Sequence, residues 1–468
     1  FSFIFQYTLN DFRDLIKYLR KNGIKSHFTA GGHFPSIETQ LTFEIIPELN
    51  SIVRFEGELT LIDLIQSIDD EDKWYDIPGL AFKRNSEIKI NNTRPLIKDL
   101  DNLPDLFRKE PFESVAEIKI AYMLASRGCL HNCSFCSIRQ FYGNTNGPLR
   151  RTRSPKSVVA EMNNLYNNFG VRFFLFQDDD FANRSSKQKQ WTRLFLEELE
   201  KEKLGKQIRW KISCRVDDIE PETLSLMKEQ GLTIVYLGIE SGNLKGLKTL
   251  KKGVTVEQNI NAVRLLKSLD IGILIGFMLF DPSSTILTVR ENLNFLKTIG
   301  SDGYFSINFC KMLPYAGTPI EKELKISNRL KGTVLQHDYD FLDPLLDFYF
   351  YLVQNIFTHR NFDDDGIINI LTNTEFEYQL IRFFYPEFPI GDFKKTLSGL
   401  IAKSNLQAIE TLEKVLDLVT SKDTSQLLEK SDELLELAKT EWEIEFEIEA
   451  DLHDIKRKHL SGFKNIIL

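Results

Sequence analysis

Short apolar runs alternate with segments of helical periodicity over much of the chain. The runs have the length of buried strands and fall at 118–125, 171–177, 208–214, 233–239, 271–279 and 304–309. Between most of them, apolar positions recur at helical spacing, over 155–168, 191–203, 222–230 and 255–269. Strands and helices that alternate in this way build parallel sheets, so the pattern predicts a partial TIM-like barrel of six βα units.

A second, shorter α/β pattern precedes the barrel. It consists of an apolar run at 1–6, a helical segment at 11–21, strands at 26–30 and 51–55, and a helix at 59–68. This pattern predicts a doubly wound, Rossmann-like domain over residues 1–70. The sequence opens on Phe1 rather than Met, and we therefore expect further residues upstream.

The other segments have different patterns. Residues 71–117 contain short strand-like pieces broken by turn residues, which predicts a connector with a small hairpin before a barrel domain at 118–322. Residues 323–468 lose the βα rhythm, and we expect a mainly helical C-terminal cap there. Its helical patterns lie at 342–358, 375–384, 406–420 and 425–444.

Composition narrows the class of protein. The 468 residues are 42% hydrophobic and 27% charged, with a formal net charge of −8. This acidic balance argues against nucleic acid as a partner, because phosphate binding needs a basic face. No apolar run reaches roughly 18 residues, so we expect no membrane span. No signal peptide opens the sequence and its five cysteines form no disulfide framework, so a cytoplasmic protein is predicted.

Three of the five cysteines are concentrated in one loop after the first barrel strand. Cys129, Cys133 and Cys136 have the spacing Cx3Cx2C, which suits an iron–sulfur cluster or zinc. A zinc knuckle would need a fourth ligand, and His131 lies between the first two thiols, where it is poorly placed to complete a tetrahedron. Three thiolates around four irons leave one iron open to bind another molecule, so a 4Fe–4S cluster is predicted.

This loop resembles that of the radical S-adenosylmethionine (SAM) enzymes, and the resemblance extends over about residues 119–320. In that family the fourth iron chelates the amino and carboxylate groups of SAM. Electron transfer from the cluster then cleaves SAM to a 5′-deoxyadenosyl radical, which abstracts a hydrogen atom. The resemblance implies that the three cysteines hold the cluster and that Phe135 borders the adenine; the alternative for Phe135 is a loop aromatic at the barrel mouth.

Residues at the carboxyl ends of the strands are the further candidates for SAM binding, because function gathers at that edge of a barrel. After its second strand the family often has Gly-Gly-Glu, which accepts from the SAM ammonium group. This chain departs from that pattern and has Asp178 and Asp180, which are the candidates for the same role. The alternatives for these two residues are a solvated acidic turn or a divalent-metal site. Arg215 could pair with the SAM carboxylate. Glu240 lies in a Gly-x-Glu-Ser-Gly element that resembles the family's and would accept from the ribose or ammonium group. Gly276 would let the adenine lie against the backbone.

A second resemblance covers residues 1–68. A strand followed by Gly31-Gly32-His33, and about twenty residues later Glu56-Gly57-Glu58 before a helix, resembles the later part of the cobalamin-binding domain that precedes many radical SAM cores. In that family both segments line the cavity for the corrinoid and its nucleotide tail. The Asp-x-His-x-x-Gly loop that supplies a lower-axial histidine is absent from the sequence, which leaves the lower ligand of cobalt open, with His33 as a weak candidate. The alternative for the two glycines is a tight βα turn without a ligand.

Together the resemblances imply a cobalamin-dependent radical SAM enzyme that methylates an unactivated carbon. One SAM would methylate cobalt, another would supply the radical, and methylcobalamin would return the methyl group to the substrate. The alternatives are ring contraction or cyclisation without methyl transfer, a methylthiotransferase, and a non-catalytic iron–sulfur or corrinoid carrier. Methylthiotransferases carry three further cysteines in the first domain, whereas residues 1–117 contain none. The expected partners are a small-molecule or peptide substrate and an external electron donor of the flavodoxin or ferredoxin type.

Overall fold

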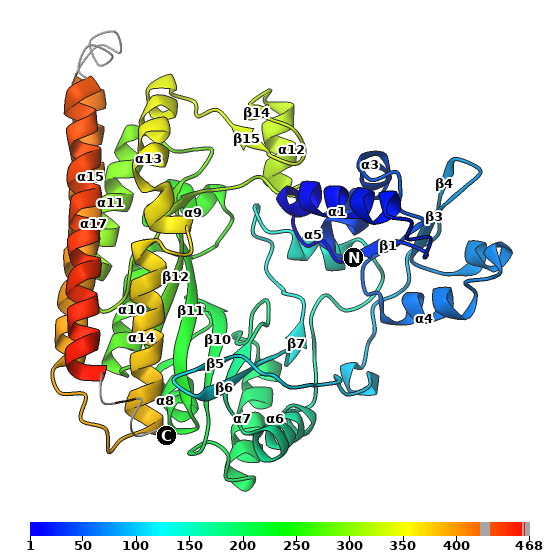
Figure 1. The fold of residues 1–468 in the computed structure, drawn as a ribbon, viewed down its shortest axis with the longest axis horizontal. Helices are drawn as coiled ribbons and strands as arrows, with labels where there is room; N and C mark the ends of the chain where they lie inside the picture. Colours follow the sequence, from blue (N-terminus) through cyan, green and yellow to red (C-terminus); the bar gives the residue numbers. More distant parts are fainter. Residues whose placement is uncertain (422–430, 461–462, 464–468) are drawn as a thin grey trace. The chain divides into compact units, whose positions relative to one another are not determined.

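The chain forms two compact units in this computed structural model, which describes residues 1–421, 431–460 and 463 (Figure 1). The first unit consists of residues 1–103, 127–152 and 313–340, and the second of residues 104–126, 153–312 and 341–468. The loop with three cysteines therefore belongs to the same compact unit as the N-terminal α/β segment.

The first unit is built on a four-stranded mixed sheet. Its strands are β1 (Thr29–Gly31), β2 (Ser51–Val53), β3 (Leu80–Arg84) and β4 (Glu87–Ile90), in that spatial order. The β1 and β2 strands are parallel, and β3 and β4 add an antiparallel hairpin to the same sheet. The strand expected at 1–6 is reduced to a single bridge between Ser2 and Gly31, because the chain turns at Gln6 into a 3-10 helix, η1 (Gln6–Thr8).

Short helices complete the first unit. They are α1 (Leu9–Lys21), α2 (His33–Ile37), α3 (Thr39–Ile45), α4 (Glu58–Gln66), α5 (Ile138–Gly143) and α12 (Pro319–Ile326). A core that includes Phe3, Ile16, Phe34 and Ile52 forms where the sheet meets α1 to α3. A second apolar cluster joins Phe55 of the first segment to Phe141 of α5, so the cysteine loop continues into a helix that packs within this unit.

The second unit contains a seven-stranded sheet that confirms the predicted partial barrel. The spatial order is β13-β12-β11-β10-β9-β6-β5. From β6 to β13, each strand of this sheet lies beside the strand of the same sheet that follows it in sequence. These strands are parallel, and the short β5 is antiparallel to β6. Their bounds are β5 (Ser114–Val115), β6 (Ile118–Met123), β9 (Val171–Phe176), β10 (Arg209–Arg215), β11 (Leu232–Glu240), β12 (Gly272–Phe280) and β13 (Cys310–Lys311).

Helices connect the parallel strands and pack on the sheet. They are α6 (Pro155–Phe169), α7 (Ser186–Lys201), α8 (Pro221–Glu229), α9 (Leu244–Thr249), α10 (Val256–Ser268) and α11 (Ile286–Gly300). Local sequence fixes their ends. Ser154 caps α6 by accepting from Ser157 N, Gly170 ends that helix in the left-handed conformation, and Thr255 with Gln258 forms a capping box at α10.

The last strand is shorter and lies later than expected, because β13 is Cys310–Lys311 and residues 304–309 form no strand. Their backbone groups bond to side chains of the C-terminal helices instead of to β12. Asn405 accepts from Ile307 N at 2.9 Å and donates to Phe305 O at 2.9 Å, and Arg360 Nη1 donates to Ile307 O at 3.1 Å. An apolar run in a sequence does not reveal that its hydrogen-bonding partners will be distant side chains.

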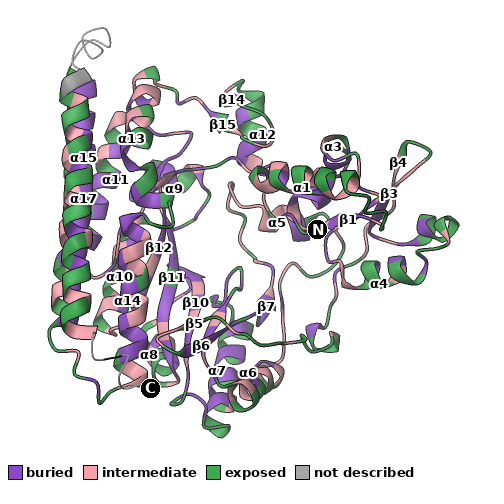
Figure 2. Ribbon diagram, viewed as in Figure 1, coloured by how far each residue is buried: buried purple, intermediate pink, exposed green. Residues whose placement is uncertain are grey.

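Four long helices follow the sheet: α13 (Pro344–Phe362), α14 (Ile367–Phe384), α15 (Phe393–Ser421) and α17 (Ser431–Leu460). The α15 and α17 helices run side by side (Figure 1), and exposed residues follow their outer faces while β9 to β12 are largely buried (Figure 2). The expected helix at 425–444 lies outside the described residues from 425 to 430. Among the described helices, none is both long and apolar enough to span a membrane.

Candidate active site

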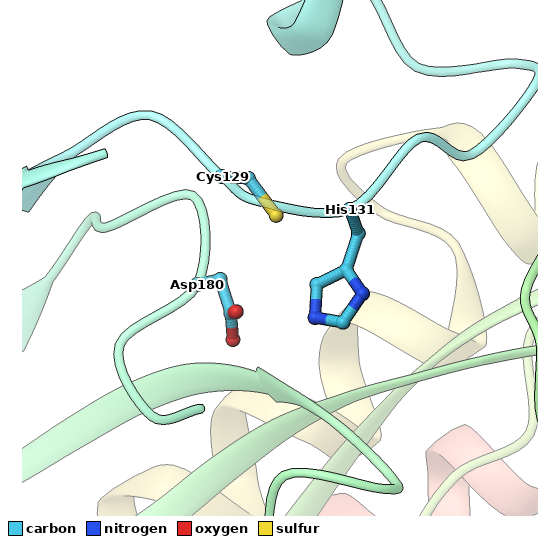
Figure 3. A group of neighbouring side chains, drawn as sticks. All are labelled: Cys129, His131 and Asp180. Carbon is cyan, nitrogen blue, oxygen red and sulfur yellow. The ribbon is translucent and has the colours of Figure 1, made fainter. Parts of the chain in front are cut away.

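The loop between β7 (Ser126–Arg127) and α5 holds the three clustered cysteines. All three are half-buried thiols rather than halves of disulfides. Cys136 N donates to Cys133 O at 3.3 Å, which tightens the Cx2C turn. Cys129 and His131 project from the same stretch of the loop (Figure 3), with Cys129 Sγ within 4.8 Å of a ring nitrogen of His131. Thiols gathered on one partly exposed loop are a donor set that fits an iron–sulfur cluster.

Close packing at its start and a backbone hydrogen bond in its middle fix the course of this loop. Gly128 has a φ of 81°, and a Cβ there would lie 1.8 Å from Leu149 O, so no side chain is tolerated directly before Cys129. In the middle of the loop, Ser134 O accepts from Ile320 N at 3.1 Å, at the start of α12. Phe135 is half-buried between Cys133 and Cys136. The loop is thus held by backbone contacts within its own unit.

Glu56 connects the strand before the cysteine loop, β7, and the strand after α5, β8 (Arg151–Thr152), to the N-terminal segment. Its carboxylate accepts from Arg151 Nη1 at 2.8 Å and from Arg127 Nη1 at 3.0 Å. Burial alone would raise the pKa of Glu56, but hydrogen bonds from Arg151, from Ile97 N and from Arg127 hold it below its usual value. The neighbouring Glu58 accepts from Arg127 Nη2 at 2.6 Å. Two of the residues predicted to line a corrinoid cavity therefore make ion pairs with the segments that flank the cysteines.

The other predicted corrinoid-lining residues also have partners within the first unit. A Cβ on Gly32 would lie 2.2 Å from Phe3 O, so the N-terminal strand-like segment already occupies the space that this glycine leaves. The His33 ring stacks on Phe141 with centroids 4.1 Å apart, and its Nδ1 lies 3.4 Å from Ser137 Oγ. These contacts account for Gly32 and His33 without a ligand. The corrinoid site remains a prediction.

Asp178 and Asp180 follow β9 in the second unit and are both buried. Asp178 Oδ2 accepts from Ala125 N at 3.0 Å and Asp178 Oδ1 accepts from Ser126 Oγ, so this carboxylate fixes the chain where it leaves β6 for the cysteine loop. Asp180 lies on the loop after β9 (Figure 3), and its charge contributes, after burial, to raising the pKa of the Cys214 thiol. Asp178 thus has a structural role at the end of β6.

Arg215, at the end of β10, lies in a buried group of charges. Its Nε donates to Asp217 Oδ1 at 2.9 Å and its Nη2 donates to Lys252 O. Asp218 Oδ2 lies 3.8 Å from the same Nε. The guanidinium predicted to pair with a SAM carboxylate is therefore held by two carboxylates of its own chain, which orient it and offset the cost of burying it.

Glu240 ends β11 in an unusual backbone conformation, with a φ of 66°. Its Oε1 lies 3.3 Å from Lys252 Nζ, and both side chains are largely buried, at 12% and 3% exposure. A Cβ on Gly238 would lie 2.9 Å from Glu240 Oε1, and one on Gly276 would lie 3.3 Å from Glu240 Oε2 and 2.4 Å from Tyr236 Oη. Gly276 therefore makes room for Tyr236 and Glu240 at the barrel interior.

The turn after Glu240 is held by buried amides that the sequence analysis did not select. Asn292 Oδ1 accepts from Gly242 N at 2.8 Å and from Asn243 Nδ2 at 3.0 Å, while Asn259 Nδ2 donates to Ser241 O at 2.9 Å. Lys252 was also missed. A lysine in a loop of otherwise solvated charges does not reveal in a single sequence that it will be buried. An asparagine on the apolar face of a helical pattern does indicate a buried polar contact, and Asn259 and Asn292 could have been found in this way.

The two solitary cysteines are not suited to bind metal. Burial raises the pKa of the Cys214 thiol well above its usual value, and burial, with a contribution from the Glu240 charge, raises the pKa of Cys310 to about 12. Metal ligation requires the thiolate, so these two residues are disfavoured relative to the three half-buried thiols of the loop.

Known proteins are similar to this chain over the cysteine loop and the strands that follow it. Residues 123–296 match the model of the radical SAM superfamily. An uncharacterized methyltransferase of Pyrococcus horikoshii is 29% identical over 320 residues, which cover 68% of this chain and 66% of that protein. The anaerobic magnesium-protoporphyrin IX monomethyl ester cyclase of Cereibacter sphaeroides is 29% identical over 327 residues, covering 68% of this chain and 51% of that protein. The chain thus spans between half and two thirds of the length of these relatives.

The fold of almost the whole chain is similar to that of a solved enzyme. This enzyme is the cobalamin-dependent SAM radical enzyme OxsB with aqua-cobalamin bound, which matches with a TM-score of 0.70 over 99% of this chain and 75% of that one, at 19% sequence identity. The superfamily match covers the cysteine motif and the strands β9 to β12, and the fold likeness extends over the N-terminal segment and the C-terminal helices. Residues 123–296 are therefore similar to the radical SAM superfamily, and the chain has the fold of a cobalamin-dependent radical SAM enzyme.

Proposed function

We propose that this chain is a cobalamin-dependent radical SAM enzyme that transfers a methyl group to an unactivated carbon atom. The observation that carries the proposal is the loop after β7, where three half-buried thiols lie within eight positions of one another. This loop lies inside the range that matches the radical SAM superfamily. The name of the Pyrococcus horikoshii relative supports methyl transfer, and the fold likeness to OxsB supports cobalamin as a cofactor.

Each part of the proposed site has a separate task. Cys129, Cys133 and Cys136 would hold a 4Fe–4S cluster. With this cluster one SAM would supply a radical that takes hydrogen from the substrate, and a second SAM would supply, through cobalamin, the methyl group that replaces it. Phe135, Asp178, Asp180, Arg215, Glu240 and Gly276 remain the residues that we propose for SAM binding, and residues 31–33 and 56–58 those for cobalamin. The protein's contribution is placement and the exclusion of water.

The partners follow from the chemistry. Each reductive cleavage of SAM consumes one electron, which we propose comes from a flavodoxin or ferredoxin. The cluster is labile to oxygen and its ligands must stay reduced, which supports a reducing cytoplasm as the working compartment. A small molecule or a peptide would be the substrate.

Cyclisation without methyl transfer is the second candidate, because the Cereibacter sphaeroides relative is named a cyclase. Incubation of the reduced enzyme with methyl-deuterated SAM and candidate substrates separates the two. A methyltransferase yields 5′-deoxyadenosine and a product that carries the deuterated methyl group. Release of 5′-deoxyadenosine with an unlabelled, rearranged product would establish cyclisation instead, and the absence of 5′-deoxyadenosine in every case would contradict both.

A further inference from the structure

A cavity of about 200 Å³ lies inside the second unit, between the inner face of the sheet and helix α14. Its walls are mainly apolar and include Leu175, Ile234, Leu274 and Phe376. Two charged residues, Lys211 from β10 and Glu375 from α14, also line it. None of these residues belongs to the proposed SAM or cobalamin sites.

The cavity lies away from the carboxyl edge of the sheet. Lys211 pairs in register with Leu175 of β9 and Ile234 of β11, in the first half of β10 and β11. Arg215 is four residues farther along β10, which at about 3.3 Å per residue corresponds to roughly 13 Å. Along β10 the cavity therefore lies deeper in the half-barrel than Arg215, which stands at the carboxyl edge where SAM would bind.

Lys211 is the single basic residue on the cavity walls. Its Nζ donates to Ser213 Oγ at 3.1 Å and lies over the Tyr236 ring, 5.6 Å from the centroid, and among the described residues no carboxylate forms an ion pair with it. Burial lowers the pKa of Lys211. An ammonium group in a mainly apolar cavity is costly without a counter-ion, so an anion bound there would supply the partner that the protein chain does not.

Glu375 does not take the place of that counter-ion. Burial raises the pKa of Glu375 to about 8, and the positive charge of Lys394 opposes the rise only in part. Its carboxyl group is mainly protonated at neutral pH, so it can donate a hydrogen bond and does not repel an anion.

We propose that this cavity binds an amphiphilic anion, a carboxylate or phosphate on an apolar skeleton, with the anionic group at Lys211 and the skeleton against Leu175, Ile234, Leu274 and Phe376. The charge of Lys211 selects the anionic group, and the apolar walls select the body. This site does not depend on the reaction proposed at the carboxyl edge.

Calorimetric titration of the full-length protein with octanoate, octyl phosphate and 1-octanol tests the proposal. We expect one site per chain that binds at least one of the anions more tightly than the alcohol. Lys211→Met should weaken binding of that anion by about tenfold or more, because a hydrogen bond to a charged group is lost, and should leave the alcohol almost unaffected. Lys206→Met, which changes an exposed lysine just before β10, should change neither.

A second variant covers the case in which Lys211→Met does not fold. Asn373 is exposed and lines the cavity, so Asn373→Trp should be tolerated by α14 while it blocks the space and abolishes binding of all three ligands. The anion that binds more tightly identifies the headgroup as carboxylate or phosphate. Equal affinity for octanol and both anions, unchanged anion affinity in Lys211→Met, or unchanged binding in Asn373→Trp would overturn the proposal.

Discussion

Both carboxylate oxygens of Glu56 lie 2.8 Å from Arg151 Nη1, and the two side chains are almost completely buried, at 6% and 2% exposure. Glu56 also accepts from Arg127, so one carboxylate of the N-terminal segment holds the two residues that bracket the cysteine loop. The sequence placed Glu56 beside a corrinoid; the structure shows that it has a role in fixing the loop that would hold the cluster.

Glu56→Ala should destabilise the protein by about 3 to 5 kcal/mol, because it leaves Arg151 buried without a counter-charge. Urea unfolding followed by circular dichroism measures this loss. The matched control is Glu58→Ala, which removes a half-exposed partner of Arg127 and should cost about 1 kcal/mol or less. The double variant Glu56→Met/Arg151→Met should recover much of the loss, and a double variant as unstable as Glu56→Ala would contradict the account.

The ion pair at Lys252 and Glu240 gives a prediction for SAM binding. Lys252→Met leaves the Glu240 carboxylate largely buried without its cation, so we expect a loss of about 3 kcal/mol in the free energy of unfolding. We also expect SAM affinity to fall by about tenfold, because Lys252 orients the proposed acceptor. Equilibrium dialysis with labelled SAM measures the affinity. Lys251→Met changes the exposed neighbour and should alter neither quantity; equal effects of both variants would exclude the ion pair as the cause.

His33 should make the stability of the protein depend on pH. Burial lowers the pKa of His33 from 6.5 to about 4. Between these values the unfolded chain takes up a proton that the folded protein does not, so stability is complete above about pH 6.5 and falls as the pH drops towards 4. The loss is at most about 3 kcal/mol, reduced by the partial exposure of the ring.

Urea midpoints measured at several pH values test this dependence. His33→Phe keeps the stacking on Phe141 and should make the curve less steep between pH 6.5 and about 4, while His27 and His337, whose pKa values burial also lowers, keep part of the slope. The control His453→Asn removes a histidine that is 77% exposed and should leave the curve as it is in the unchanged protein. A curve that keeps its full slope in His33→Phe would show that other groups titrate instead.

The contrast between predicted and observed elements has a physical basis. The strands β9 to β12 and the helices between them follow from local periodicity, because a central parallel strand must be apolar and a surface helix must be amphipathic. Residues 304–309 have the same apolar pattern but bond to Asn405 and Arg360, which lie far away in sequence. The proximity of Arg151 to Glu56 could not be read from the sequence either, since 95 residues separate them.

In the candidate site, too, some residues could be predicted from the sequence and others could not. Three closely spaced cysteines are a local signal, and the structure gathers them on one half-buried loop. Lys252, which pairs with Glu240, becomes visible only once the turn after β11 is folded, whereas Asn259 and Asn292 lie on the apolar faces of helical patterns. Such positioning residues lie in ordinary helical or loop patterns, and their spacing along the chain has no fixed relation to the site that they hold.

Metal analysis after anaerobic purification with cobalamin supplied tests the central claim most directly. We predict about four irons, about four sulfides and one cobalt per chain. The variant Cys129→Ala/Cys133→Ala/Cys136→Ala should lose the iron and keep the cobalt, whereas Cys214→Ala, at a buried thiol, should keep both. Iron that survives the triple substitution would contradict the assignment of the cluster, and a chain that carries iron but no cobalt would contradict cobalamin-dependent methyl transfer.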